Sequence, residues 1–483
     1  MNCVIFLVGF LLQRVNGQNW ELKFMEPHEG GNLLLSEGEE RIVTYNITVH
    51  SSESSSIYMI STNTKVVDII GGINHSVTGG VSVIPNVTVR GIFLGRASLT
   101  FQVNRKLNGT VSSTRTKGGN SWYELPVVLD VVVKKYEGVL NKIFQGSVIV
   151  LVCVANIAMG CKTDVQVVKT TLRTPIAPLT GLASQFILMP LISFTVGYLL
   201  QLTPPMAFGL FAMGCSPGGA ASNVYTYFLD GNVSLSVTMT FVSTIASLAL
   251  IPLWLFTLGI HVIYRTETVT IPFVNIVISL VGLIVPVGIG IVIQKKLPKV
   301  AEFLLKLLRV VAVIFCILVF TIGIYANLYI FRLMTPLNLL AGALLPYIGF
   351  IFGAVMAFAT RRNKRDILTI AIETGIQNSG VAIVLLQMSL PHPDSDIAIV
   401  SPVNCSLFTP IPVVIAIIIH VIRKKWFRKD EVKDTKQEVG SGNEDGDQNV
   451  PVTYHYKSRE AEEEEEDGEH GEGTNGHHLL KKS

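Results

Sequence analysis

Charged side chains are scarce in this chain and very unevenly placed. They make up 15% of its 483 residues, whereas 49% of the residues are hydrophobic and the mean hydropathy is +0.49. Between residues 143 and 422 nearly all charges stand in short loops, and the C-terminal end is dense with them. Soluble globular proteins carry more charge than this. The composition therefore predicts an integral membrane protein. The net charge of +3 combines residues that lie in the bilayer with residues that lie in water.

Cysteines are also few, six in all, and none stands between residues 18 and 142. If that region lies outside the cell, it folds without disulfides. No two cysteines have the C-x-x-C spacing of a metal site, and the sequence has no nucleophile with a neighbouring base and no phosphate-binding loop. We therefore expect the cysteines to be packing residues and the protein not to be an enzyme.

Residues 1–17 form a short apolar stretch. It is too short for a membrane span and fits the hydrophobic part of a signal peptide, although it lacks a leading lysine or arginine. An uncleaved anchor is the alternative. A signal peptide would place the following residues outside the cell or in a lumen.

Residues 18–140 alternate between apolar and polar side chains, as in RIVTYNITV from position 41 and RASLTFQV from position 96. This period of two, with breaks rich in Gly, Ser and Asn, predicts a small extracellular β-sandwich. The region contains four N-x-S/T sequons, which predict glycosylation at Asn46, Asn74, Asn86 and Asn108. Two further sequons, Asn232 and Asn404, fall in an inner loop and within a span, where we expect no glycan.

Nine apolar segments follow within residues 141–425, each long enough to cross a membrane as a helix. They are residues 143–161, 177–200, 206–228, 233–259, 270–293, 304–327, 337–359, 367–389 and 397–421. An odd number of spans that starts outside ends inside. Lysine and arginine gather in the predicted inner loops, whereas the predicted outer loops between spans hold only Arg265 and Arg332. This distribution predicts an extracellular or lumenal N-terminus and a cytoplasmic C-terminus.

The C-terminal segment, residues 426–483, is acidic and almost free of apolar side chains. Such a segment cannot bury a core, so we expect a disordered cytoplasmic tail. Its histidines His470, His477 and His478 could bind a metal loosely, but a solvated linker is the better interpretation of so sparse a cluster.

Glu373 is the only acidic side chain well inside a predicted span. A charge at that depth costs about 2.5 to 3.5 kcal/mol, so the side chain needs a partner or a function. Within the spans, lysine and arginine stand only at the inner end of the sixth, at Lys306 and Arg309, and none lies at the depth of Glu373. A protonated glutamate that forms hydrogen bonds between helices is the alternative interpretation.

Two predicted spans are interrupted by polar, glycine-rich stretches. One stretch, residues 375–380, follows Glu373, and the other, residues 217–219, precedes Ser222 and Asn223. Irregular backbone at membrane depth is tolerated only inside protein or beside a water-filled cavity, although a proline kink is an alternative for the second stretch. The two spans run in opposite directions at corresponding places in halves of four and five spans. This arrangement predicts an inverted repeat whose oxygen ligands bind a hard cation such as sodium, as in a cation-coupled carrier.

The same residues resemble the bile acid:sodium symporter family, solute carrier family ten, over residues 140–425. Its G-C-S-P-G-G-x-x-S-N motif stands at Gly214 to Asn223, its E-T-G-x-Q-N motif at Glu373 to Asn378, and its Q-x-x-x-M-P motif at Gln185 to Pro190. The β-rich N-terminal region is similar to the branch of the family that has a long extracellular N-terminal domain. The resemblance implies an all-helical membrane domain with nine transmembrane helices, inverted repeats and two broken helices that cross.

The resemblance also implies a function, namely sodium-coupled symport of an organic anion of the bile acid or steroid-conjugate type. The sodium ligands at matching positions would be Gln185, Ser222, Asn223, Ser236, Thr240, Glu373 and Gln377, and Asn378 would face the substrate. Sodium ions would be co-substrates, with no cofactor. The expected partners are sodium, an amphipathic organic anion and the lipid bilayer, in the plasma membrane, with no nucleic acid. The rival interpretation is a non-transporting membrane protein whose ectodomain binds a partner.

Overall fold

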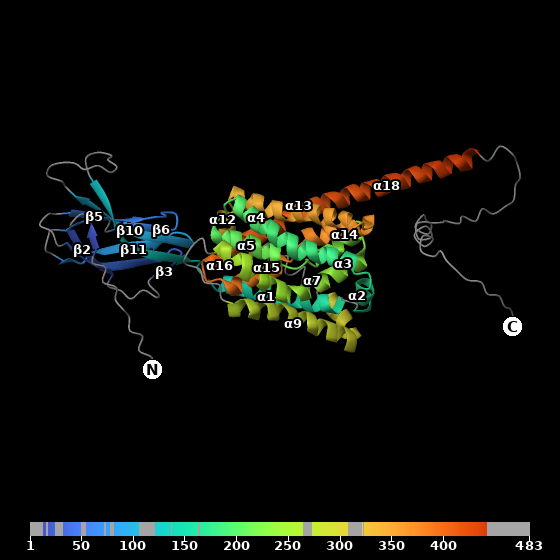
Figure 1. Ribbon diagram of the computed structural model, residues 1–483, viewed down its shortest axis with the longest axis horizontal. Coiled ribbons are helices and arrows are strands. Elements are labelled where there is room, and N and C mark those ends of the chain that lie inside the picture. Colours follow the sequence, from blue (N-terminus) through green and yellow to red (C-terminus); the bar gives the residue numbers. More distant parts are fainter. Residues whose placement is uncertain are drawn as a thin grey trace. The chain divides into compact units, whose positions relative to one another are not determined.

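The computed structural model describes residues 13–15, 18–24, 32–49, 55–71, 74–77, 82–105, 121–136, 138–162, 165–263, 273–307, 321 and 323–441. The structure is mostly helical, with a β-rich region ahead of the helices (Figure 1). The predicted combination of apolar helices and a small N-terminal β region is confirmed. Contacts within the chain divide it into residues 1–420 and residues 421–483.

Two sheets form the β-rich region. The first has the order β1-β2-β4-β9-β6, with β8 paired to β4, and its strands are Gln13–Val15, Gln18–Phe24, Glu40–Val49, Asn86–Gly91, Val67–Gly71 and Ser82–Val83. The second has the order β3-β11-β10-β5-β7, and its strands are Asn32–Ser36, Ser121–Lys134, Gly95–Arg105, Ser55–Ser61 and Asn74–Val77. Neighbouring strands are antiparallel except β3 and β11, which are parallel.

The alternating residues of the strands pack into one apolar core between the two sheets. Val43 and Tyr45 of β4 enter this core from the first sheet, and Leu99 and Phe101 of β10 enter it from the second. The rings of Tyr45 and Phe101 meet edge to face, with 5.0 Å between their centroids. Burial raises the pKa of Tyr45 to about 12. A single core shared by two sheets is the arrangement of a β-sandwich.

The N-terminal strand lies within the segment that we expect to be a signal peptide. β1 pairs with β2 at the edge of the first sheet, and residues 1–12 lie outside the described residues. Among the predicted glycosylation sites, Asn108 also lies outside them. Asn86 stands at the start of β9 with an exposed side chain, which suits a glycan.

The described residues contain five helical runs that are long and apolar enough to cross a membrane. These are Lys142–Cys161, Ile176–Leu199, Val233–Val262, Pro336–Ala359 and Asp394–Lys424. Two shorter apolar helices are α5 (Pro204–Cys215) and α15 (Ser379–Ser389). The first run lies in α1 (Val139–Lys162), which packs along α9 (Phe273–Lys296).

Several of these runs consist of more than one helical element. The element bounds are α3 (Ile176–Ala183), the π-helical turn η2 (Ser184–Leu188) and α4 (Met189–Leu199); α6 (Ala221–Phe228); α7 (Val233–Trp254), the π-helical turn η3 (Leu255–Gly259) and α8 (Ile260–Ile263); α13 (Pro336–Ala359); α14 (Lys364–Gly375); and α17 (Val400–Phe408). Each predicted break is a real one, because α5 ends before α6 and α14 ends before α15. Figure 1 shows α3, α4, α5, α13 and α14 as neighbours in one bundle.

The structure departs from the sequence prediction in its short helices and near the C-terminus. The short helices α2 (Val165–Leu172), α11 (Ile324–Ala326), α12 (Leu328–Leu333) and α16 (Asp394–Ala398) were not predicted, because they are too short to produce a spanning pattern. The helix α18 runs from Pro410 to Ser441, so residues 426–441, expected in the disordered tail, are helical. No proline or glycine stands between residues 413 and 439, and residues 426–439 include several strong helix formers, namely arginine, lysine, glutamine and glutamate. The rest of the predicted tail, and most of the sixth predicted span, lie outside the described residues.

The loop after β9 contacts the helical region. Leu94 packs in one cluster with Tyr329 and Ile330 of α12 and Val400 of α17. The guanidinium of Arg96 binds the buried carboxylate of Asp394 in α16, with Nη2 2.7 Å from Oδ2 and Nε 3.4 Å from Oδ1. A two-pronged contact of this kind is the strong geometry for an arginine–carboxylate pair.

Candidate cation site

Two unwound segments meet where α5 gives way to α6 and α14 gives way to α15. Gly218 and Gln377 form an antiparallel bridge. On either side of it, the Gly219 N–H donates to the Ile376 carbonyl at 2.9 Å and the Asn378 N–H donates to the Pro217 carbonyl at 2.9 Å. These bonds satisfy backbone groups that the helix breaks would leave unpaired in a membrane. The structure therefore brings the two interrupted spans together.

Gly218 allows the crossing to lie directly against Glu373. A Cβ atom at this position would stand 2.4 Å from Glu373 Oε1, and one at Gly219 would stand 2.9 Å from the Gln377 carbonyl oxygen. Both distances are shorter than side chains tolerate. Glycine is therefore required if the unwound backbone is to form one wall of the space around the carboxylate.

Glu373 is 2% exposed and is surrounded by hydroxyl groups. Ser222 Oγ donates to its Oε2 at 2.5 Å, and Ser236 Oγ stands 3.0 Å from the same oxygen. On the other side, Thr240 Oγ1 donates to Oε1 at 2.5 Å. Three of the predicted sodium ligands, one from α6 and two from α7, thus converge on the carboxylate of α14.

Each of these hydroxyls has two acceptors within hydrogen-bond distance. Ser222 Oγ is also 2.8 Å from the Gly219 carbonyl, Ser236 Oγ is 2.9 Å from Asn223 Oδ1, and Thr240 Oγ1 is 3.0 Å from the Ser236 carbonyl. A hydroxyl has a single hydrogen and can donate to one acceptor at a time. Lone pairs therefore outnumber hydrogens around Glu373. Such a cluster of oxygens is suited to a hard cation.

Gln185 and Gln377 border the crossing. The π-helical turn η2 presents Gln185, whose Nε2 donates to the Ser216 carbonyl at 2.7 Å. Gln185 Oε1 and Gln377 Nε2 are buried and have no hydrogen-bond partner among the described residues. A half-turn of the Gln377 amide would exchange its nitrogen for its oxygen. An unpaired buried acceptor is costly unless a ligand supplies the missing interaction.

Asn378 occupies a position at the end of the break. It is half-buried, and its Oδ1 accepts from the Val381 N–H at 3.2 Å, which caps α15. The structure thus gives the predicted substrate-facing residue a role in holding the start of this helix.

Sequence reasoning missed other polar residues of the site. Ser243 Oγ accepts from the Gly218 N–H at 3.3 Å and donates to the Thr240 carbonyl at 3.0 Å. Thr226 Oγ1 lies 3.5 Å from Ser236 Oγ. Ser243 continues a buried polar stripe on α7 that could have been recognised from its helical spacing, at residues 236, 240, 243, 244 and 247.

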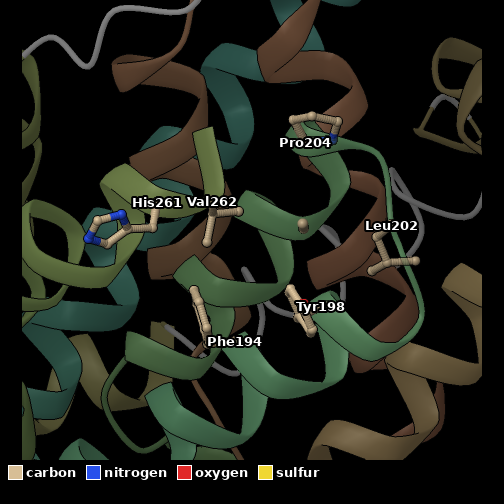
Figure 2. Close-up of a pocket in the computed structure, with 8 residues that line it drawn as sticks. Phe194, Tyr198, Leu202, Pro204, His261 and Val262 are labelled. Atoms are coloured by element: carbon tan, nitrogen blue, oxygen red, sulfur yellow. The ribbon is translucent and has the colours of Figure 1, made fainter. Parts of the chain in front are cut away.

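A hollow elsewhere in the bundle shares no residue with this site. Figure 2 shows part of its lining: Phe194 and Tyr198 of α4, Leu202 and Pro204 at the turn into α5, and His261 and Val262 of α8. Its lining is mostly apolar, and none of the predicted sodium ligands contributes to it. The converging oxygens, and not this hollow, therefore define the candidate site.

This chain is similar in sequence to known proteins. The model of the Sodium Bile acid symporter family matches residues 148–335. The sodium-dependent organic anion transporter of Homo sapiens is 32% identical over 281 residues, which cover 58% of this chain and 72% of that protein. The ileal sodium/bile acid cotransporter of Mus musculus is 29% identical over 300 residues, or 62% and 85% of the two chains. A solved structure of WR4, a C. elegans MSP family member, aligns with 22% of this chain and 94% of the WR4 chain at 12% identity. The TM-score of 0.15 is too low to indicate a shared fold.

Proposed function

This chain belongs to the sodium bile acid symporter family, and from that premise we propose that it is a sodium-coupled symporter of an organic anion of the bile acid or steroid-conjugate type. The observation that carries the proposal is the excess of lone pairs over hydrogens around the buried Glu373. A non-transporting anchor would have no use for such a cluster. All the side chains expected to bind sodium are present and buried.

The first sodium site consists of the oxygens that surround Glu373. Its ligands are the carboxylate of Glu373, the hydroxyls of Ser222, Ser236 and Thr240, and the side-chain oxygen of Asn223. A sodium ion among them compensates the buried charge and lets each hydroxyl turn its hydrogen toward its second acceptor. Each hydroxyl then still donates one hydrogen bond within the protein, and the carboxylate oxygens of Glu373 are released to the ion.

The second sodium site lies on the side of the crossing where Gln185 and Gln377 stand. The unpaired Oε1 of Gln185 and the amide of Gln377 supply oxygens, and Glu373 supplies charge. Two sodium ions and one carboxylate leave a net positive charge at the crossing. An organic anion beside Asn378 compensates that charge, so the anion binds best after both cations.

The membrane arrangement follows from the sequence. We propose nine spans in two inverted repeats, an extracellular β-sandwich over residues 18–140 that carries the glycans, and a cytoplasmic C-terminus. The plasma membrane is the proposed location. The hydrogen bonds between residues 217–219 and 376–378 support a pair of crossing helices at the centre of these repeats.

Replacement of Glu373 by glutamine tests the proposal. Glu373→Gln keeps the size of the side chain and removes the charge that compensates the cations, so sodium-dependent uptake of labelled bile acids and steroid sulfates should be abolished. Ser222→Ala removes one neutral ligand and should weaken sodium affinity by about tenfold. Uptake is measured in sodium and in choline, and sodium-induced thermal stabilisation of the purified protein is measured in parallel.

The matched control is Glu302→Gln, because it removes an exposed carboxylate from another helix. This control should behave as the wild type in both assays. If sodium stabilises Glu373→Gln as much as it stabilises the wild type, the cation binds elsewhere. This result would favour the alternative, a non-transporting membrane protein. If sodium stabilises the wild type but none of the tested anions is taken up, the cation site stands and the proposed substrate class is wrong.

A further inference from the structure

The π-helical turn η2 presents Gln185 at the crossing, and Pro190 follows this turn. In an α-helix the carbonyl of residue 186 accepts from the N–H of residue 190. Proline has no N–H, so Pro190 cannot supply that bond. Within the turn, the Met189 N–H donates instead to the Ser184 carbonyl, five residues earlier. The Phe186 carbonyl is therefore open to a donor from outside its own helix.

Trp254 supplies this donor. Its indole Nε1–H donates to the Phe186 carbonyl at 2.6 Å. Trp254 is the last residue of α7, the helix whose Ser236 and Thr240 contact Glu373. Its half-buried ring packs against a cluster that includes Phe208, Phe211 and Leu255, which restricts the direction of the indole N–H.

The direction of the Gln185 side chain depends on this turn. A π-helical turn holds one residue more than an α-helical turn, so its loss would rotate the residues on one side by about 100° relative to the other. The present turn places Gln185 Nε2 2.7 Å from the Ser216 carbonyl and leaves Oε1 buried and without a partner. A rotation of that size would break this contact.

We propose that Trp254 is a positioning residue for sodium coupling, because its indole replaces the backbone donor that Pro190 lacks and thereby holds Gln185 toward the crossing. The inference rests on the proposed function, in which Gln185 binds the second sodium ion. Trp254 itself contacts neither cation nor anion. It acts through the Phe186 carbonyl and so joins α7, which supplies ligands of the first site, to the turn that supplies Gln185.

The test is Trp254→Phe in the full-length protein, because phenylalanine keeps an aromatic ring and removes the donor. The sodium concentration for half-maximal uptake should rise about tenfold, as expected for one lost hydrogen bond to a buried carbonyl. The Hill coefficient for sodium should fall toward one, whereas maximal uptake per surface molecule should stay near the wild-type value. Trp426→Phe removes the indole of a tryptophan that is 72% exposed and should leave both sodium parameters unchanged.

Pro190→Ala provides the rescue, because alanine restores an N–H at position 190. The double variant P190A/W254F should require less sodium than W254F alone and should match P190A. If W254F does not reach the cell surface, the comparison of P190A with P190A/W254F carries the test. Equal half-saturation by sodium supports the proposal, and a tenfold difference overturns it.

Other results separate this inference from the proposed function. If Gln185→Ala weakens sodium affinity but W254F, present at the surface, does not, the positioning role is wrong and the symporter stands. If W254F lowers only maximal uptake and P190A does not rescue it, the role of Trp254 is general packing and the proposal fails. If wild-type uptake does not depend on sodium, the proposed function is wrong, and the positioning role of Trp254 in sodium coupling is wrong with it.

Discussion

The β-rich region and the helical region have opposite interiors. Buried side chains of the two sheets are almost all apolar, with Ser61 and Thr100 as the exceptions among the described residues. The helical region buries serines, threonines, asparagines, glutamines and Glu373, and it exposes large apolar side chains such as Ile351 and Phe358. The first pattern is that of a domain in water, and the second is that of a bundle in lipid.

This difference shows where a buried polar group indicates function. In a β-sandwich core, an unpaired polar atom only lowers the stability of the fold. In a helical bundle within lipid, an unpaired polar side chain indicates a ligand site where it borders other oxygens that converge on one space. Gln185 and Gln377, which border the crossing, are such side chains.

The apolar core of the β-rich region can be broken by a single truncation. Phe101→Ala should destabilise this region by about 3 to 5 kcal/mol, because Phe101 is fully buried and its ring meets that of Tyr45 edge to face. Hydrogen exchange of the β10 amides in the full-length protein measures the effect. Ile60→Ala, at a side chain that is 39% exposed on β5, should change protection far less. Equal effects of the two truncations would show that the core is misplaced.

The exteriors of the two regions can be compared with one substitution made in each. Ile351, in the middle part of α13, is 61% exposed, and Ile42 on β4 is 54% exposed. Ile351→Lys should cost about 2.5 to 3.5 kcal/mol on insertion into the membrane. Ile42→Lys should change stability by less than about 0.5 kcal/mol, because its surroundings are aqueous. The fraction of full-length chain delivered to the membrane measures both.

Leu337→Lys, at the start of α13, is the control for position along the helix. Its side chain is exposed, and a lysine there can extend to the aqueous interface, so the cost should lie between those of the two isoleucine variants. Delivery of Ile351→Lys at the wild-type level would contradict a lipid-facing α13.

Removal of a single glycosylation site should distinguish the two regions by a change in apparent mass, with no change in stability. Asn86→Gln should remove one glycan and lower the apparent mass, as should Asn46→Gln, because both asparagines stand on strands of the proposed extracellular sandwich. Asn232→Gln should leave the mass unchanged. Asn232 caps α7 and donates to Asp366 Oδ1 at 2.8 Å, so the structure already employs its side chain. A glycan on Asn232 would reverse the proposed orientation of the spans.

The sequence predicted the site better than it predicted the helix ends. Glu373 stood out because of its depth, and residues 217–219 and 375–380 stood out because they interrupt apolar spans. Ser236, Thr240 and Gln185 came from the family resemblance, and the structure places the first two against Glu373. Ser243 was missed although its helical spacing was visible.

Other features could not be obtained from the sequence pattern. The bond from Trp254 to the Phe186 carbonyl joins residues 68 positions apart, and no local periodicity contains that information. The short helix α16 produces no spanning pattern, and its ion pair with Arg96 is 298 residues distant along the chain. The extension of α18 was missed because charged residues suggested disorder, whereas their helix propensity is high.

The short backbone bridge at the crossing makes the two halves of the bundle mechanically interdependent. Residues 217–219 and 376–378 are joined by their peptide groups, so these bonds do not depend on the identity of a side chain unless a substitution displaces the backbone. A displacement that pulls α5 away from α15 must break these bonds within the membrane, where no water replaces them. Ser222 and Asn223 follow the segment 217–219, and Glu373 precedes the segment 376–378. The candidate ligands that follow these two segments therefore move together, and a partly separated site is not an intermediate that this architecture favours.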